Sequence, residues 1–355
     1  MRNLRNFKKI AMKRIVSILV LLLSLTAVAE LRWAATTLDF GTIREDEGRA
    51  TRHFHFRNVG DSAVDITRIR TSCGCTSSDY VRHGIQPGEA DSMPIHYNPI
   101  GRPGSFNKLI HLTASDSTYT LHIVGNVIPS EVTLADRFPH SIGALRTSAN
   151  AALFGDVISG RSRSARISAY NISNDTLVLD FDKLPAMCSA SASPDTIPPG
   201  NTTSIAITFR TTPAMEFGWQ SHSIDLIQNG KAFPINITAT VKAAPGECPD
   251  NAPVAELADD KIIFADFGSQ KHPKTTIVIR NSGGSPLVVK HFASEDAALD
   301  ASTTLPTVIE PGKSAKIQFT LDPLKETDSI INKEVIIYTN DPVKPNRTIR
   351  LVGNK

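Results

Sequence analysis

The sequence predicts an all-β protein, in which a signal peptide precedes three tandem immunoglobulin-like β-sandwich domains. Two observations predict this fold class. Apolar and polar residues alternate over short stretches, which is the period of a strand with one buried face, and one order of turn signals occurs three times along the chain. A chain of 355 residues also suits two or three domains of about 100–150 residues each.

The N-terminus predicts export. Six basic residues lie within the first 14 positions, an apolar run follows at 15–25, and Ala27-Val28-Ala29 supplies the small residues that a signal peptidase accepts. We therefore expect a signal peptide at 1–29 and a mature chain that begins at Glu30. No later apolar run approaches the length of a membrane span, so we expect no membrane span in the mature chain. The predicted location is the periplasm or the cell surface.

Three marks recur in the same order in each predicted domain. The first is a Phe-Gly pair, the second is an Asn-containing turn after a strand, and the third is Ile-x-Pro-Gly before another strand. They stand at Phe40-Gly41, Asn58-Val59-Gly60 and Ile85-Gln86-Pro87-Gly88; at Phe154-Gly155, Asn171-Ile172-Ser173-Asn174 and Ile197-Pro198-Pro199-Gly200; and at Phe267-Gly268, Asn281-Ser282-Gly283-Gly284 and Ile309-Glu310-Pro311-Gly312. The first and last glycines are 47, 45 and 44 residues apart, which indicates an internal repeat.

The repeat fixes the predicted domain limits. We expect domains at 30–128, 150–243 and 254–355, with a connection at 129–149 and a linker at 244–253 that is rich in Pro and Gly. Within the domains, runs such as Met93, Ile95 and Tyr97 alternate with polar residues, and no stretch after residue 30 keeps a helical period. About seven short strands per domain of about 100 residues are typical of a sandwich.

The charge pattern argues against nucleic acid as a partner. The formal net charge is +3, but the six basic residues of the predicted signal peptide account for the excess. The remaining 32 basic residues face 35 acidic ones, so the predicted mature chain carries about −3. A slightly acidic body lacks the basic footprint that nucleic-acid binding requires.

The first domain resembles a known family. It carries Asp39-Phe40-Gly41-Thr42-Ile43, Ser72-Cys73-Gly74-Cys75-Thr76 and Ile85-Gln86-Pro87-Gly88, and the segment 54–60 reads FHFRNVG. These residues are similar to the bacterial domain of unknown function fifteen-seventy-three, which has an SCGCT signature and is common in Bacteroidota. That family is similar to the Ig-like domains called ASPM, SPD-2 and Hydin. The resemblance implies an Ig-like fold and an exported protein, and it implies no established activity.

Cysteine chemistry is the sharpest local feature of the sequence. Cys73 and Cys75 flank one glycine, and export would permit a disulfide. Three interpretations stay open: a local structural bridge or turn, a redox-active pair, and a soft-metal site. Cys188 lies 12 residues before Gly200, much as Cys75 lies 13 before Gly88, which favours the structural interpretation. Cys188 and Cys248 could form a second disulfide.

Other candidate sites carry weaker signals. His53 and His55 lie on one face of a predicted strand and could bind a metal, but a solvated outer face explains them better, and we predict no metal and no cofactor. Phe217-Gly218-Trp219 could stack on a sugar, although packing at a strand is the stronger interpretation. Glu45-Asp46-Glu47 fits a solvated turn. Motifs of common hydrolases, metalloproteases and nucleotide-binding proteins are missing from the sequence.

The lineage that the resemblance implies predicts O-glycosylation at Asp, then Ser or Thr, then a small or aliphatic residue. Six triplets in the sequence fit this pattern, and the predicted turns would expose them. The candidate hydroxyls belong to Ser62, Ser92, Ser117, Thr176, Thr196 and Ser329.

Together these features predict an exported, non-enzymatic envelope protein that acts as a structural or a protein- or ligand-binding module. The expected partner is another envelope protein or a surface glycan. Two alternatives stay open: a periplasmic redox or metal-handling protein that uses Cys73 and Cys75, and a carbohydrate-binding accessory protein, which Trp219 suggests.

Overall fold

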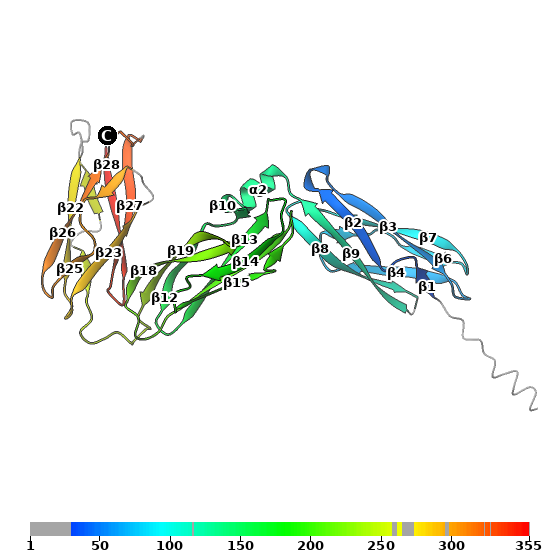
Figure 1. Cartoon of the computed structure of the whole chain (residues 1–355), viewed down its shortest axis with the longest axis horizontal. Helices are drawn as coiled ribbons and strands as arrows, with labels where there is room; N and C mark the ends of the chain where they lie inside the picture. Colours follow the sequence, from blue (N-terminus) through cyan, green and yellow to red (C-terminus); the bar gives the residue numbers. More distant parts are fainter. Residues whose placement is uncertain are drawn as a thin grey trace, which may run out of the picture. The chain divides into compact units, whose positions relative to one another are not determined.

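The computed structural model describes residues 30–115, 117–257, 261–264, 273–294, 298–322, 324–326 and 328–354. The predicted signal peptide at 1–29 and the third Phe-Gly pair lie outside the described residues. Strands make up most of the described chain, and six sheets form three sandwiches, each made of two sheets (Figure 1). The predicted fold class is therefore confirmed.

The first sandwich packs a four-stranded sheet of order β1-β3-β7-β5 against a five-stranded sheet of order β2-β9-β8-β4-β6. A short 3-10 turn, Glu45–Glu47, follows β2. The strands are β1 (Leu31–Trp33), β2 (Thr37–Arg44), β3 (Ala50–Asn58), β4 (Val64–Thr71), β5 (Thr76–Ser77), β6 (Arg82–Ile85), β7 (Ala90–Tyr97), β8 (Gly104–Ala114) and β9 (Ser117–Ile128).

The second sandwich consists of a sheet of order β10-β11-β13-β17-β15 and a sheet of order β12-β19-β18-β14-β16. The helix α2 (Glu131–Arg137) precedes it. Its strands are β10 (His140–Ile142), β11 (Leu145–Thr147), β12 (Ala151–Ile158), β13 (Ser162–Asn171), β14 (Leu177–Asp182), β15 (Cys188–Ser193), β16 (Thr196–Ile197), β17 (Thr202–Arg210), β18 (Gly218–Gln228) and β19 (Lys231–Lys242).

The third sandwich repeats the strand order of the first, with sheets β20-β22-β26-β24 and β21-β28-β27-β23-β25. Its strands are β20 (Ala255–Leu257), β21 (Lys261–Phe264), β22 (Lys274–Asn281), β23 (Leu287–Ala293), β24 (Leu299–Ala301), β25 (Thr307–Ile309), β26 (Ser314–Leu321), β27 (Ile330–Thr339) and β28 (Asn346–Asn354). Among the described helical residues, no helix has the length and apolar character that crossing a membrane requires.

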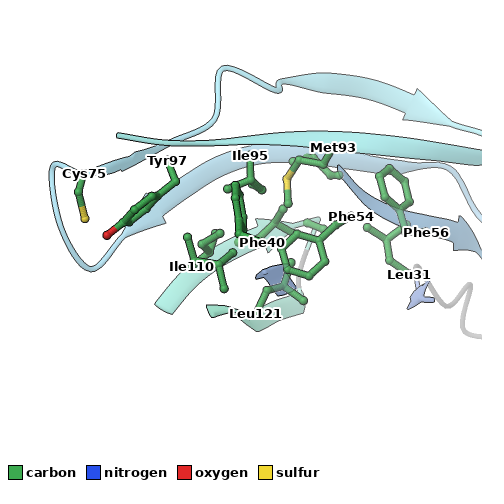
Figure 2. Packing of buried hydrophobic residues seen from close by; sticks show 14 of the residues in the cluster. Leu31, Phe40, Phe54, Phe56, Cys75, Met93, Ile95, Tyr97, Ile110 and Leu121 are labelled. Atoms are coloured by element: carbon green, nitrogen blue, oxygen red, sulfur yellow. The ribbon is translucent and has the colours of Figure 1, made fainter. Parts of the chain in front are cut away.

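Each sandwich has its own hydrophobic core between its two sheets. In the first, the side chains that alternate inward from β3 and β7, such as Phe54, Phe56, Met93 and Ile95, form one core with Ile110 from the opposite sheet (Figure 2). Burial of apolar surface on this scale is the main force that stabilises a domain of this size. The strand alternation seen in the sequence thus places the core side chains as predicted.

A buried asparagine explains two of the three recurring marks. Asn58, Asn171 and Asn281 end β3, β13 and β22, and all three are fully buried. In each sandwich the Nδ2 group donates to the carbonyl of the marked isoleucine at 2.9 Å and to a turn carbonyl at 2.8 Å, and the Oδ1 atom accepts from a turn N–H. The glycine of Ile-x-Pro-Gly donates its N–H to the asparagine carbonyl at 2.8–3.0 Å. The near-constant distance between the asparagine turn and Ile-x-Pro-Gly therefore reflects one repeated hydrogen-bonded junction.

The Phe-Gly mark forms a β-bulge in an edge strand. In the first two sandwiches these edge strands are β2 and β12, which pair in parallel with β9 and β19, the last strands of their sandwiches. The β2–β9 register shifts between Asp39 and Thr42, and the β12–β19 register shifts at the equivalent place. Gly41 and Gly155 have φ angles of +67° and +61°, in the region that favours glycine. The preceding phenylalanines point into their cores, so the mark combines a core residue with a bend.

The predicted connection at 129–149 is wrong in its second half. Residues 140–147 form β10 and β11, and β11 pairs with β13 so that Leu145 stands opposite Asn171. This is the position that Leu31 holds opposite Asn58 in the first sandwich. Each strand is only three residues long, which is too short for an alternating pattern to show in the sequence. The second sandwich therefore begins about ten residues earlier than 150.

Residues 132–355 form one compact unit that contains the second and third sandwiches. At their junction the ring of Trp219 on β18 stacks against His291, with 4.8 Å between centroids, and packs at a tilt against Tyr338, with 4.6 Å between centroids. Gly218 has a φ of +90°, and a Cβ there would come within 2.0 Å of the Thr339 carbonyl oxygen. The junction is therefore closely packed, and position 218 requires glycine.

Candidate functional site

The two cysteines of the SCGCT segment form a disulfide in the loop between β4 and β5, with their Cα atoms 5.3 Å apart. Cys75 is 4% exposed and lies at one end of the first core, close to Tyr97, whereas Cys73 is half-buried (Figure 2). Residue 76, which follows the bridge, pairs with Tyr97 of β7. The bridge therefore fastens the loop to the core at the point where the sheet edge begins.

Hydrogen bonds hold the loop on both sides of the disulfide. The Thr71 hydroxyl donates to the carbonyls of Cys73 at 2.9 Å and Thr76 at 3.0 Å. The Asn98 N–H donates to the Cys75 carbonyl at 2.8 Å. Ser72 and Leu109 exchange two further bonds, in which each backbone N–H donates to an oxygen of the other residue. The loop is thus fixed by backbone bonds as well as by the covalent link.

The geometry determines which redox step the disulfide could undergo. An incoming thiolate could reach the half-buried Cys73 sulfur, form a mixed disulfide there and release Cys75 as a thiolate. That thiolate would be buried in apolar surroundings, which disfavours the charged form. Within the described part of the chain, the only side chain that hydrogen-bonds to either sulfur is Thr76, at 3.5 and 3.8 Å. The arrangement therefore suits a structural bridge better than an exchange centre.

The other two cysteines are free, so the disulfide between Cys188 and Cys248 that the sequence allowed does not form in this structure. Cys188 begins β15 opposite Phe209, the place that Thr76 holds opposite Tyr97. Its side chain packs against the second core, and burial raises the pKa of its thiol. Cys248 is exposed in the segment after β19, so the two thiols have different surroundings.

The two histidines that the sequence singled out as candidate metal ligands lie on an exposed face. His53 and His55 are exposed on the outer face of β3, and their neighbour on β7, His96, hydrogen-bonds through Nδ1 to the Thr51 hydroxyl at 2.9 Å. Among the residues that the structure describes, no three His, Cys, Asp or Glu side chains are grouped so that they could hold a metal ion.

The aromatic motif at Trp219 and the acidic motif at Glu45 both have structural surroundings that the sequence did not predict. Trp219 lies in the junction between the second and third sandwiches, so it does not form an open sugar platform. Glu45, expected in a solvated turn, is 6% exposed, and its carboxylate accepts from the backbone N–H groups of Gly101 at 2.6 Å and Ser130 at 2.7 Å. No local pattern signals these long-range partners, because they come from other parts of the chain.

The edge strand β15 is long for its position in the sandwich, and sequence reasoning missed it. It has the sequence CSASAS, six residues that pair with β17 on one side without a register shift. The equivalent edge strands, β5 and β24, have only two and three residues. Natural edge strands are usually short or carry charges or proline, which prevents pairing with another chain. β15 has none of these protections.

The candidate glycosylation triplets differ in exposure. Three of the hydroxyls are exposed. They belong to Thr176 in the turn before β14, Thr196 in the short strand β16, and Ser329 just before β27. Ser62 and Ser117 are half-buried. Ser92 is also half-buried and belongs to β7, where the next residue points into the core, so this triplet does not lie in a turn. Glycosylation of the three exposed hydroxyls stays a prediction.

Comparison with protein families assigns the first and third sandwiches. Residues 31–127 match the family described as "Protein of unknown function (DUF1573)". Residues 253–354 match the family described as "HYDIN/CFA65/VesB-like, Ig-like domain". The first sandwich is therefore a domain of the former family and the third is an Ig-like domain of the latter. No curated protein matches the chain.

Solved structures resemble the chain with low sequence identity. A crystal structure of a protein of unknown function from Porphyromonas gingivalis W83 covers 60% of this chain and 100% of its own, with 20% identity and a TM-score of 0.46. The match with the endo-fucoidan hydrolase MfFcnA4 of glycoside hydrolase family 107 covers 93% of this chain and 44% of the hydrolase chain, with 10% identity and a TM-score of 0.28. The match with the Vibrio cholerae VesB protease covers 28% of this chain and 32% of the protease chain, with 18% identity and a TM-score of 0.22.

Proposed function

We propose that this chain is an exported, non-enzymatic protein of the cell envelope that works as a structural and binding module. The observation that carries the proposal is the unprotected edge of β15. We propose that an extended segment of another envelope protein pairs with this edge and adds a strand to the second sandwich, a common mode of peptide recognition.

Backbone geometry defines the side of β15 that a partner would contact. The Arg210 N–H donates to the Met187 carbonyl at 2.8 Å. Because hydrogen-bonded positions alternate along an antiparallel pair, Ser189 and Ser191 direct their backbone groups toward β17, whereas Ala190 and Ala192 direct theirs outward. Among the described residues, no backbone hydrogen bond occupies these outward groups. A partner strand would satisfy them.

The side chains of β15 also suit an added strand. Cys188, Ala190 and Ala192 are half-buried against the second core, whereas the serines between them are exposed. Small side chains leave the core margin thinly covered, so apolar residues of an incoming strand would gain burial there. An alternating apolar and polar segment is therefore the partner chemistry that fits.

Site-specific crosslinking in the native host tests this proposal. A photoreactive residue at position 191 should crosslink to one envelope protein, and Ala190→Pro should abolish the product, because proline removes an outward N–H but no bond to β17. Thermal unfolding must show that the variant stays folded. A crosslink to a second copy of this chain, or a product that survives Ala190→Pro, would reject the proposed partner.

Export is tested separately. We expect the mature protein to begin at Glu30, which N-terminal sequencing of the secreted fraction would show; retention of residues 1–29 would contradict this expectation. Intact-mass measurement of the same material tests glycosylation at Thr176, Thr196 and Ser329. A mass equal to that of the bare chain from residue 30 to residue 355 would exclude it.

A further inference from the structure

One outer face of the first sandwich carries an excess of positive charge. It belongs to the sheet β1-β3-β7-β5, and its outward side chains alternate with the core residues of the same strands. We name it the arginine–histidine face. It consists of Arg32 on β1, Arg57, His55 and His53 on β3, and His96 on β7. All but the half-buried His96 are exposed.

Two like charges stand directly opposite each other on this face. Arg32 pairs with Arg57 in the β1–β3 register, and neither guanidinium has an ion-pair or hydrogen-bond partner in the described residues. Directly opposed like charges destabilise a sheet. The third sandwich has Glu256 opposite Arg280 at the equivalent position, with their charged atoms 3.8 Å apart. The arginine pair is therefore not a requirement of the fold.

Two neighbouring acids, Glu89 and Asp91, do not neutralise the face, because they bind another residue. Glu89 and Asp91 both form ion pairs with Arg82. Burial raises the pKa of Asp91, but hydrogen bonds from Tyr80 and from the Ser92 N–H, together with the charge of Arg82, hold that pKa below its usual value. The outward positions of β1, β3 and β7 contain no acidic residue.

The shape of the face favours a linear anionic ligand. Side chains that alternate along β3 are spaced about 7 Å apart, and opposed residues on neighbouring strands are about 5 Å apart. The exposed large apolar residues of the first sandwich, Val81, Ile100 and Ile128, lie outside these strands. Peripheral membrane attachment normally combines basic residues with inserted apolar ones. A hydrated polyanion fits this face better than a lipid surface.

We propose that the arginine–histidine face binds an extended anionic polysaccharide. Arg32 and Arg57 would pair with its carboxylate or sulfate groups, and the histidine N–H groups would donate to neighbouring oxygens. This inference goes beyond the strand-edge function proposed above. It concerns a different sandwich and stands independently of β15.

The sharpest test converts the first sandwich to the charge pattern of the third. Arg32→Glu places an acid opposite Arg57, so it should preserve the fold and weaken the ligand site. The matched control is Arg68→Glu, which makes the same charge change at an exposed position on β4 in the other sheet. Calorimetry with the full mature chain would use a heparin oligosaccharide and an oligogalacturonate as probes at physiological ionic strength.

We expect Arg32→Glu to weaken binding of at least one probe by about tenfold, and Arg68→Glu to change it by less than about twofold. Equal losses in the two variants, or no binding by the wild type, would overturn the proposal. Tighter, Arg32-dependent binding to phosphatidylglycerol-containing vesicles would replace the polysaccharide with a lipid surface. Ala190→Pro should leave probe binding unchanged, which separates this test from that of the proposed function.

Discussion

The first and third sandwiches have the same strand order and the same buried asparagine, yet they differ on the surface. Arg32 opposes Arg57 in the first, where the third has the ion pair of Glu256 and Arg280. The first also closes the loop before its edge strand with the Cys73–Cys75 disulfide. The shared positions determine the fold, whereas the differing ones are free to serve recognition. The comparison therefore directs the search for a ligand of the first sandwich to its outer surface.

The shared asparagine should give the largest effect. Asn58→Ala removes three hydrogen bonds of 2.8–3.0 Å and leaves two carbonyls, of which that of Ile85 is buried, and one N–H without their partner. We expect a loss of about 3–5 kcal/mol in the free energy of unfolding, at about 1 kcal/mol or more per bond. Asn281→Ala should cost the third sandwich a similar amount. Hydrogen exchange, resolved by sandwich, would measure the free energy of unfolding of both variants. A loss below about 1 kcal/mol in either variant would show that the two asparagines do not have the same structural role.

The contact between the second and third sandwiches should give the next largest effect. Limited proteolysis is expected to cut the exposed residues 245–251 first. The nicked halves should stay associated through Trp219, His291 and Tyr338. Trp219→Ala should weaken the junction by about 2–3 kcal/mol, because it deletes a large apolar contact. Size-exclusion chromatography after nicking would show the halves separating only in the variant; separation of the wild-type halves would contradict this prediction.

The disulfide loop, which the third sandwich lacks, should contribute less. Replacing Cys73 and Cys75 with serine opens a very short covalent loop. The chain-entropy model predicts that this lowers the free energy of unfolding by about 1–2 kcal/mol. The loop keeps the hydrogen bonds from Thr71 and Asn98, so the first sandwich should stay folded. Urea unfolding would measure the loss, with Cys188→Ser as the control. Loss of an electron-transfer or tight metal-binding activity in the double variant would instead support the redox or metal alternative.

Alternation along strands and recurring turn marks allow the sequence to predict the cores of the sandwiches. The limit before the second sandwich could not be predicted, because β10 and β11 are three residues each and are stabilised by pairing with β13. The sequence also singled out Cys73, Cys75, His53 and His55. It could not show that Arg32 opposes Arg57, because this pairing depends on the register of two strands more than twenty residues apart.

The smallest expected effect tests the surface charges directly. Glu256→Arg would give the third sandwich the opposed arginines of the first, and Arg32→Glu would give the first the ion pair of the third. The existing pair is more than half exposed, so each exchange should change the free energy of unfolding by only about 0.3–1 kcal/mol.

The signs of these two changes should be opposite. Arg32→Glu should stabilise the first sandwich and Glu256→Arg should destabilise the third, and added salt should shrink both effects because exposed charges are screened. Thermal unfolding at low and high ionic strength would measure them. If Arg32→Glu instead destabilised the first sandwich, the arginine pair would be part of the structural framework of that sandwich. The position of the pair on the arginine–histidine face would then no longer argue for a ligand.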